Sequence, residues 1–281
     1  MNALEIKNLT KNFSEFNLGE LNLTLPGGCI MGLIGENGAG KSTLIKLILG
    51  ILKKDGGSIR VLGKDNEKDL HITKEDIGVV LDEAGIPENL NTKEVGKIMS
   101  LIFKNWDGKV YGDYLKKLSV PQNKPFKDFS RGMKMKLGIA IALSHKSKLL
   151  ILDEATSGLD PIVRDEVVNI FADFARDEEH SVLISSHIVS DLEKICDYIT
   201  FLHKGKILLC EEKDLLLSKY GIVHLTRDEF ANIDQSAIKH KRETAYGVEA
   251  LVLREKAPEK AKIYPVNLEE LFVAMAKEEI R

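Results

Sequence analysis

The stretch CIMGLIGENGAGKSTLIKLILG, residues 29–50, joins a short apolar run, a glycine-rich loop and an amphipathic run. The apolar run predicts a buried strand of a parallel sheet, and the run after Lys41 predicts a helix that ends near Gly50. The loop GENGAGKST, residues 35–43, fits the pattern G-x-x-x-x-G-K-[ST], in which backbone N–H groups surround phosphates. A chance glycine-rich turn is the alternative, but the lysine, the spacing and the strand–loop–helix order favour a phosphate loop.

The residue types in this loop suit a nucleotide. The Lys41 ammonium would neutralise charge on the β- and γ-phosphates, and the Ser42 hydroxyl suits Mg²⁺, which prefers oxygen ligands. The residues expected to contact the nucleotide are Gly35, Asn37, Gly38, Gly40, Lys41, Ser42 and Thr43.

Two further buried runs end in polar side chains. LLILDE ends in Asp153 and Glu154, and SVLISS is followed by His187. Because ligands bind at the carboxyl ends of parallel strands, we expect these groups near the phosphate loop. Asp153 would hold Mg²⁺ through water, Glu154 would act as general base, and His187 would contact the γ-phosphate or the attacking water. Solvated acids and a tolerated polar histidine are the alternatives.

The whole chain reads as an α/β protein. Strand and helix patterns alternate over most of it, which predicts a phosphate-loop NTPase core with a mostly parallel sheet. Residues 3–9 and 22–25 predict an N-terminal antiparallel β portion. Residues 84–147 read as helical, with Thr92 as the cap of a helix through Phe103. We expect one domain over residues 1–220 and a small α+β appendage over residues 221–281.

Composition limits the class of protein. The chain has 281 residues, a net charge of -3, 43% apolar and 30% charged residues, as in a soluble globular protein. The near-balanced charge gives no support for a nucleic-acid partner. Cys29, Cys196 and Cys210 form no metal or redox pattern and predict reduced thiols in the cytosol. No export signal and no apolar run of about 18 residues is seen, so any membrane role would be peripheral.

FSRGMKMKLGIA, residues 129–140, predicts a helix with Ser130 as its N-cap. A helix N-terminus favours an anion, yet this segment has no phosphate-binding lysine loop of its own. An ordinary capped helix is the alternative.

Together these motifs resemble the ATP-binding subunit of ABC transporters over roughly residues 1–220. GENGAGKST resembles the Walker A motif, and LLILDE resembles the Walker B motif with its catalytic glutamate. SGLD (residues 157–160) resembles the D-loop, and the histidine of SSH resembles the switch histidine. FSRGMKMK resembles the signature motif L-S-G-G-Q, with Arg131 in place of the first glycine and Met133 in place of the glutamine.

The resemblance implies a homodimer that sandwiches ATP and Mg²⁺ between two subunits. Ser130 and the backbone at Gly132 would then contact the γ-phosphate held by the other subunit. One position departs from the family pattern, and a second has two possible roles. Asp82 stands where the family has the Q-loop glutamine and would be a Mg²⁺ or water ligand, with Glu83 as the alternative. Phe13 occupies the place of the aromatic that stacks on adenine, or is a core residue at a strand end.

Segments 77–95 and 105–121 are similar to a bacterial branch that serves peptide-antibiotic resistance, lantibiotic immunity or toxic-peptide export. This resemblance implies an ABC-2 type membrane permease as partner and a peripheral position on the cytoplasmic face of the membrane. The permease would hold the substrate site. A soluble ABC ATPase that acts on ribosomes is the alternative, although such chains normally carry two ATPase units. The last 60 or so residues would brace the dimer or bind a regulator.

Overall fold

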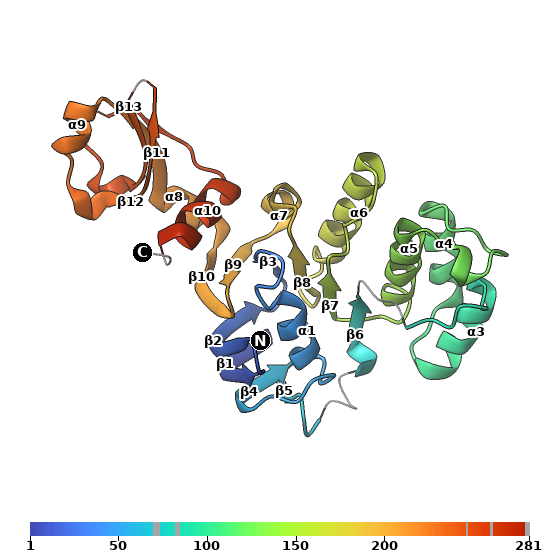
Figure 1. Cartoon of the computed structure of the whole chain (residues 1–281). Coiled ribbons are helices and arrows are strands. Elements are labelled where there is room, and N and C mark those ends of the chain that lie inside the picture. Colours follow the sequence, from blue (N-terminus) through green and yellow to red (C-terminus); the bar gives the residue numbers. More distant parts are fainter. Residues whose placement is uncertain (70–73, 82–84, 246, 259–260, 279–281) are drawn as a thin grey trace.

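The computed structural model describes all residues except 70–73, 82–84, 246, 259–260 and 279–281 (Figure 1). Its centre is a six-stranded sheet with the order β10-β9-β3-β8-β7-β6. Five of these strands are parallel, and β10 is antiparallel to β9. The strands are β3 (Ile30–Ile34), β6 (Ile77–Val80), β7 (Leu149–Asp153), β8 (Ser181–Ser186), β9 (Tyr198–His203) and β10 (Lys206–Glu212). This arrangement confirms the predicted α/β fold.

Both faces of the central sheet are covered, which is why its strands read as continuous apolar runs. Alternate residues of one strand enter two different cores. Leu149 and Ile151 of β7 pack with α1 (Lys41–Ile48) and the N-terminal sheet, whereas Leu150 and Leu152 pack with the helices of the other face. Those helices include α6 (Pro161–Phe174) and α7 (Val189–Ile195).

The N-terminal portion is a separate four-stranded antiparallel sheet, as the sequence predicts. Its order is β2-β1-β4-β5. The strands are β1 (Asn2–Asn12), β2 (Asn17–Pro26), β4 (Gly56–Val61) and β5 (Lys64–Asp65).

Three helices gather beside the β6 end of the central sheet (Figure 1): α3 (Thr92–Ile102), α4 (Gly108–Lys117) and α5 (Arg131–Ala142). The expected cap Thr92 is wrong. Asn91 caps α3 by accepting hydrogen bonds from the N–H groups of Lys93 and Glu94, while the Thr92 hydroxyl donates to the carbonyl of Gln122. Ser130 caps α5 as predicted.

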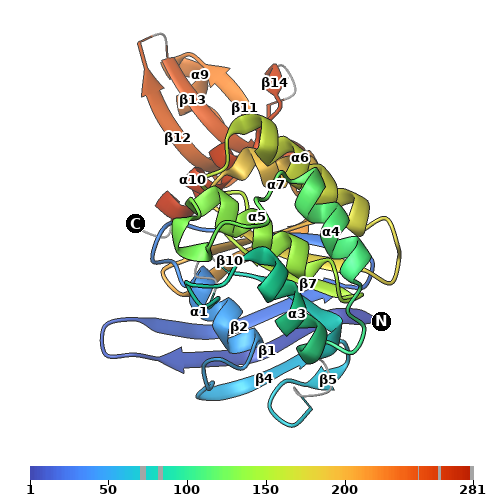
Figure 2. The same cartoon turned by 90° about the vertical axis from the view of Figure 1, so that its right-hand side faces the viewer.

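The C-terminal residues build a third sheet, β12-β13-β11-β14, which projects from the rest of the molecule (Figure 2). Helix α10 turns back and packs against α7. The elements are α8 (Lys213–Lys219), β11 (Tyr220–Leu225), α9 (Arg227–Ala231), β12 (Ile238–Thr244), β13 (Gly247–Leu253), β14 (Ile263–Tyr264) and α10 (Leu268–Glu278). Short 3-10 turns occupy Lys74–Asp76, Phe126–Asp128, Gln235–Ala237 and Arg254–Lys256.

None of the helices in the described part of the chain is both long enough and apolar enough to span a bilayer.

Candidate nucleotide site

The glycine-rich loop joins the end of β3 to the start of α1. Gly40 has φ 109°, and a Cβ there would lie 2.9 Å from the Phe16 ring, so only glycine fits this position. The Lys41 side chain folds back over the loop and its Nζ donates to the Gly35 carbonyl at 2.7 Å. No side chain caps the N-terminus of α1, and its first residues, Lys41, Ser42 and Thr43, line the cavity above the loop.

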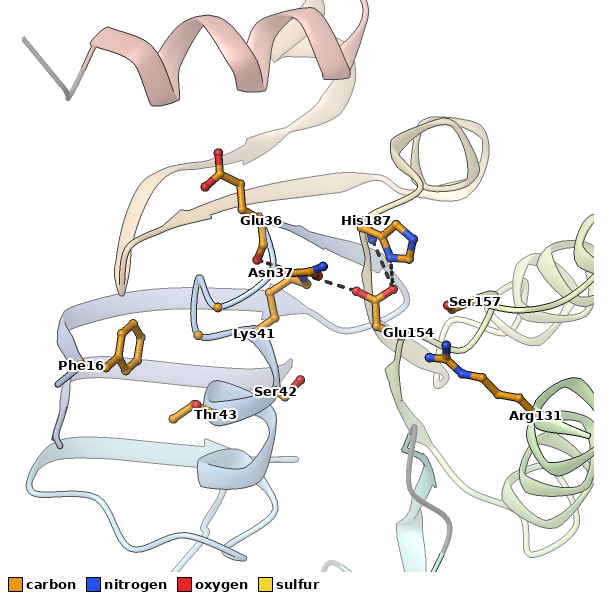
Figure 3. Close-up of a pocket in the computed structure, with 12 residues that line it drawn as sticks. Phe16, Glu36, Asn37, Lys41, Ser42, Thr43, Arg131, Glu154, Ser157 and His187 are labelled. Carbon is orange, nitrogen blue, oxygen red and sulfur yellow. Dashed lines mark hydrogen bonds and ion pairs between the residues drawn. The ribbon is translucent and has the colours of Figure 1, made fainter. Parts of the chain in front are cut away.

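A cavity of about 400 Å³ lies over this loop (Figure 3). The loop supplies one wall, and the ends of β7 and β8 supply another. The lining residues are Phe16, Glu36, Asn37, Gly38, Gly40, Lys41, Ser42, Thr43, Arg131, Glu154, Ser157 and His187.

The two acids at the end of β7, Asp153 and Glu154, lie in different environments. Asp153 is 5% exposed, and its Oδ1 accepts a 2.6 Å hydrogen bond from the Ser185 hydroxyl. Glu154 follows in a left-handed conformation with φ 53°, which turns its side chain into the cavity. The Glu154 Oε2 lies 2.6 Å from Nδ1 of His187, and Oε1 lies 3.5 Å from Nζ of Lys41. The structure therefore joins the phosphate-loop lysine, the acid and the histidine in one cluster.

Most of the residues expected at the site meet at this cavity. Asn37, Gly38, Gly40, Lys41, Ser42, Thr43, Glu154 and His187 line it, and the Gly35 carbonyl holds Lys41 beside it. Asp153 lies at the buried strand end next to Glu154.

The segment around Ser130 differs from these residues, because Ser130 and Gly132 do not line the cavity. The Ser130 hydroxyl accepts a 3.2 Å hydrogen bond from the Met133 N–H, and its residue is exposed rather than part of the cavity wall. Gly132 packs against the loop after Glu154, where a Cβ would lie 3.3 Å from the Gly158 carbonyl. The expected contact of Ser130 and Gly132 with a nucleotide on a second subunit stays a prediction.

Sequence reasoning missed the aromatic side chain that lines the cavity. That residue is Phe16, whereas Phe13 is 41% exposed and its ring centroid lies 6.3 Å from that of Phe16. The signal was present in FSEF, where two phenylalanines flank the turn between β1 and β2. Adenine stacking by Phe13 stays a prediction, with Phe16 as a second candidate.

Three more residues, Glu36, Ser157 and Arg131, also line the cavity. The expected metal ligand Asp82 and its alternative Glu83 lie outside the described residues.

Three features define an ATPase of the ABC type. They are a phosphate loop on a parallel strand, an acid–histidine pair at the neighbouring strand ends, and a helical region that lies in the sequence between the loop and the acid. Residues 18–157 match the ABC transporter family. The lantibiotic transport ATP-binding protein SrtF of Streptococcus pyogenes is 38% identical over 75% of this chain and 91% of its own length. The chain therefore belongs to the ABC transporter family and is an ATP-hydrolysing member of it.

Two further comparisons agree. The bacitracin transport ATP-binding protein BcrA of Enterococcus faecalis is 34% identical over 73% of this chain and 68% of its own length. Among solved structures, a dimeric ATP-binding cassette in a post-hydrolysis state with ADP and Pi has a TM-score of 0.67 at 20% identity. The match covers 75% of this chain and 98% of that one and supports the same fold.

Proposed function

We propose that this chain is the ATPase subunit of a bacterial exporter that removes a peptide or a drug-like compound. The main support for ATP hydrolysis is the Lys41–Glu154–His187 cluster in the nucleotide cavity, which would supply the hydrolytic chemistry. The cargo class is supported by the likeness to ATP-binding proteins named for lantibiotic and bacitracin transport.

Oxygen donors in the cavity wall and at the buried strand end beside it fit Mg²⁺. Ser42 offers a hydroxyl in the cavity wall, and Asp153 offers a buried carboxylate whose orientation is fixed by Ser185. Mg²⁺ commonly binds through one or two such oxygens together with phosphates and water. Ser42 and Asp153 would hold the ion there, where its charge would offset the negative charge of the phosphate oxygens. Asp82 is proposed as a further ligand on sequence grounds alone.

Glu154 is the proposed general base. Its carboxylate takes a proton from water as the water oxygen attacks the γ-phosphorus and the bond to the β–γ bridging oxygen breaks, which leaves ADP and phosphate. The Nδ1 group of His187, 2.6 Å away, orients that carboxylate. Lys41 would exchange its contact with Glu154 for the phosphates when nucleotide binds, which frees Glu154 for the water.

The active form is proposed to be a homodimer with two ATP molecules between the subunits. Ser130 and Gly132 at the start of α5 would complete the partner's site, since they do not line the cavity of their own chain. We assign residues 1–220 to the ATPase domain, with a helical subdomain over residues 84–147, and residues 221–281 to an accessory region.

A separate ABC-2 type permease is the proposed membrane partner, and the subunit would sit peripherally on the cytoplasmic face. The test is a pull-down of the tagged Glu154→Gln chain with ATP from detergent-solubilised membranes of the source cell. Co-purification of a multi-span protein that depends on ATP supports the proposal. Recovery of ribosomes or chromosomal proteins without a membrane protein would contradict it.

A further inference from the structure

Two charged side chains connect the helix that follows Glu154 to the helix that follows His187. Arg164 lies near the start of α6, and Asp191 lies in the first turn of α7. The Nε atom of Arg164 is 3.7 Å from Oδ1 of Asp191. Neither residue lines the nucleotide cavity, and neither takes part directly in the proposed hydrolysis.

The burial of Asp191 makes this ion pair more than a surface contact. Asp191 is 5% exposed, and its Oδ2 has no hydrogen-bond partner among the residues that the structure describes. A buried carboxylate needs a compensating charge, because the loss of its hydration is otherwise far more costly than for an exposed one. Arg164, whose side chain is 29% exposed, is placed to supply that charge. Removal of either partner should therefore displace the other.

The ion pair closes a ring of connections around the acid–histidine pair. From Glu154 the chain runs through residues 157–160 into α6 and reaches Arg164. The ion pair leads from there to Asp191 in α7, and the chain leads back to His187, whose Nδ1 lies 2.6 Å from Glu154. Helices α6 and α7 also pack against each other (Figure 1). The pair thus cross-links the two segments that carry the acid and the histidine.

His187 depends on this cross-link because its own side chain is 51% exposed. Its backbone N–H donates to Oε2 of Glu154 at 3.4 Å, so backbone and ring both face the same carboxylate. Helix α7 starts two residues later, at Val189, and no side chain caps it. The direction of the His187 ring therefore follows the position of the first turn of α7, which is the turn that holds Asp191.

We infer that Arg164 and Asp191 are positioning residues for hydrolysis, because their ion pair holds α7 where His187 meets the Glu154 carboxylate. This inference rests on the proposed function, in which Glu154 is the general base and His187 orients it. The pair lies outside the cavity, so it acts on the chemical step and not on nucleotide binding. A displacement of about 1 Å in a reacting group costs about 100-fold in rate, so a partial displacement suffices for a measurable effect.

The same two helices offer a matched control. Asp165 of α6 and Lys194 of α7 form a second ion pair, with Oδ1 and Nζ 3.0 Å apart. Both side chains are more than half exposed, and Lys194 lies in the last turn of α7, farther along the chain from His187. Exposed ion pairs contribute little to stability. Asp165→Asn should therefore leave both ATP turnover and nucleotide binding as in the parent.

The test measures turnover and nucleotide affinity separately. Arg164→Gln and Asp191→Asn are each expected to lower kcat about tenfold, while the Kd of a non-hydrolysable ATP analogue stays within about twofold of the parent. Arg164→Lys keeps the charge and should retain more of kcat. The double variant should be no slower than either single variant, since both remove one and the same interaction. Asp191→Asn tests the pair from the other side if Arg164→Gln does not fold.

A second readout does not depend on activity. The ring-nitrogen NMR signals of His187, assigned by their loss in His187→Gln, report the contact with Glu154. They should move in Arg164→Gln and stay in place in Asp165→Asn. Signals that stay in place in both variants would overturn the inference.

The kinetic outcomes separate failure of this inference from failure of the proposed function. If Glu154→Gln and His187→Gln lose turnover but Arg164→Gln and Asp191→Asn turn over ATP like the parent, the inference is wrong and the proposed function stands. An equal loss of turnover in Asp165→Asn, or a parallel loss of nucleotide affinity in Arg164→Gln, would mark a general effect on the fold and would also overturn the inference. Normal turnover in Glu154→Gln and His187→Gln would refute the proposed hydrolytic roles, and this inference with them.

Discussion

Glu154 uses its two carboxylate oxygens for two different partners. Oε1 lies 3.5 Å from the Lys41 ammonium, and Oε2 lies 2.6 Å from the His187 ring. With its side chain only 15% exposed, the carboxylate is held by charge on one side and by a hydrogen bond on the other. This geometry gives an acid that is fixed in direction, as a general base requires, and still close to the loop that receives the phosphates.

Glu154→Gln should stop hydrolysis while ATP binding persists. The amide keeps the size of the side chain but cannot accept the proton of the attacking water, so phosphate release should fall at least about 100-fold. Unhydrolysed ATP should then hold two subunits together, seen as a dimer in size-exclusion chromatography with ATP. The exposed Glu178→Gln is the control and should release phosphate normally. Normal turnover in Glu154→Gln would remove Glu154 from the mechanism.

His145 gives a pH dependence that is independent of the nucleotide site. Its ring is 1% exposed, stacks on Phe103 with centroids 4.0 Å apart, and donates from Nδ1 to the Glu75 carbonyl at 3.0 Å. Burial lowers the pKa of His145 below its ordinary value of 6.5, although the nearby carbonyl and acids of Glu75 and Asp76 oppose the shift.

The direction in which stability changes with pH follows from the protons that the folded and unfolded chains bind at His145. Below pH 6.5 the unfolded chain takes up a proton at His145 that the folded chain resists, so the free energy of unfolding falls as pH drops towards the folded-state pKa. Urea unfolding between pH 7.5 and about 5 should show a steeper fall for the parent than for His145→Gln. The difference should reach at most about 1.4 kcal/mol per pH unit. Equal slopes would mean that this ring titrates alike in both states.

At the scale of elements, sequence patterns locate the helices better than their first residues. Ser130 was predicted as a cap because a single serine precedes the amphipathic run, and the structure confirms it. At α3 two adjacent residues, Asn91 and Thr92, could both cap. The choice depends on a distant group, because the Gln122 carbonyl takes the Thr92 hydroxyl and leaves Asn91 to accept from the helix. A local pattern holds no information about that carbonyl.

The start of α5 is the element on which the proposed dimer depends. Ser130→Arg should leave nucleotide binding by the single chain intact, since Ser130 does not line its cavity, but should block ATP-driven dimerisation through bulk and charge. Sedimentation with and without ATP in the Glu154→Gln background measures this. Ser130→Ala loses the same cap, a cost of about 1 kcal/mol, without added bulk and should still dimerise. If Ser130→Arg instead abolished nucleotide binding by the monomer, the assignment of this segment to a partner's site would fail.

At the scale of the whole molecule, the strand–helix order and the site at the strand ends follow from the sequence. Those features depend on local apolar runs and on the rule that ligands meet the carboxyl ends of parallel strands. Two other features cannot be predicted from the sequence: the placement of Phe16 over the loop and the return of α10 to the core. Each depends on contacts between residues far apart in the chain, such as Phe201 with Phe272. An amphipathic pattern at Leu268–Glu278 predicts a helix but does not state which surface it covers.

That return attaches α10 to the core of the central sheet, while the third sheet has an apolar cluster of its own that includes Val223 and Val252. Leu268, Leu271 and Phe272 join the same core as β8 and β9, and the Phe272 ring meets Phe201 edge-on with centroids 5.2 Å apart. The N–H of Leu268 also donates to the Glu193 carboxylate of α7 at 3.2 Å. Loss of one of these contacts should therefore be felt by the ATPase core. Whether the C-terminal residues also brace the dimer or bind a regulator stays a prediction.

Phe272→Ala tests this attachment of α10 to the core. It removes a ring that is 8% exposed from the shared core and should lower the free energy of unfolding by about 3 kcal/mol. Val273→Ala on the same helix alters a side chain that is 41% exposed and should cost about 0.5 kcal/mol or less. Calorimetry of the parent and Phe272→Ala should each give one transition, with the ATP-stabilised transition of the variant shifted down. Two separate transitions, with the ATP-dependent one unmoved by Phe272→Ala, would mean that the C-terminal region folds apart from the ATPase core and does not support it.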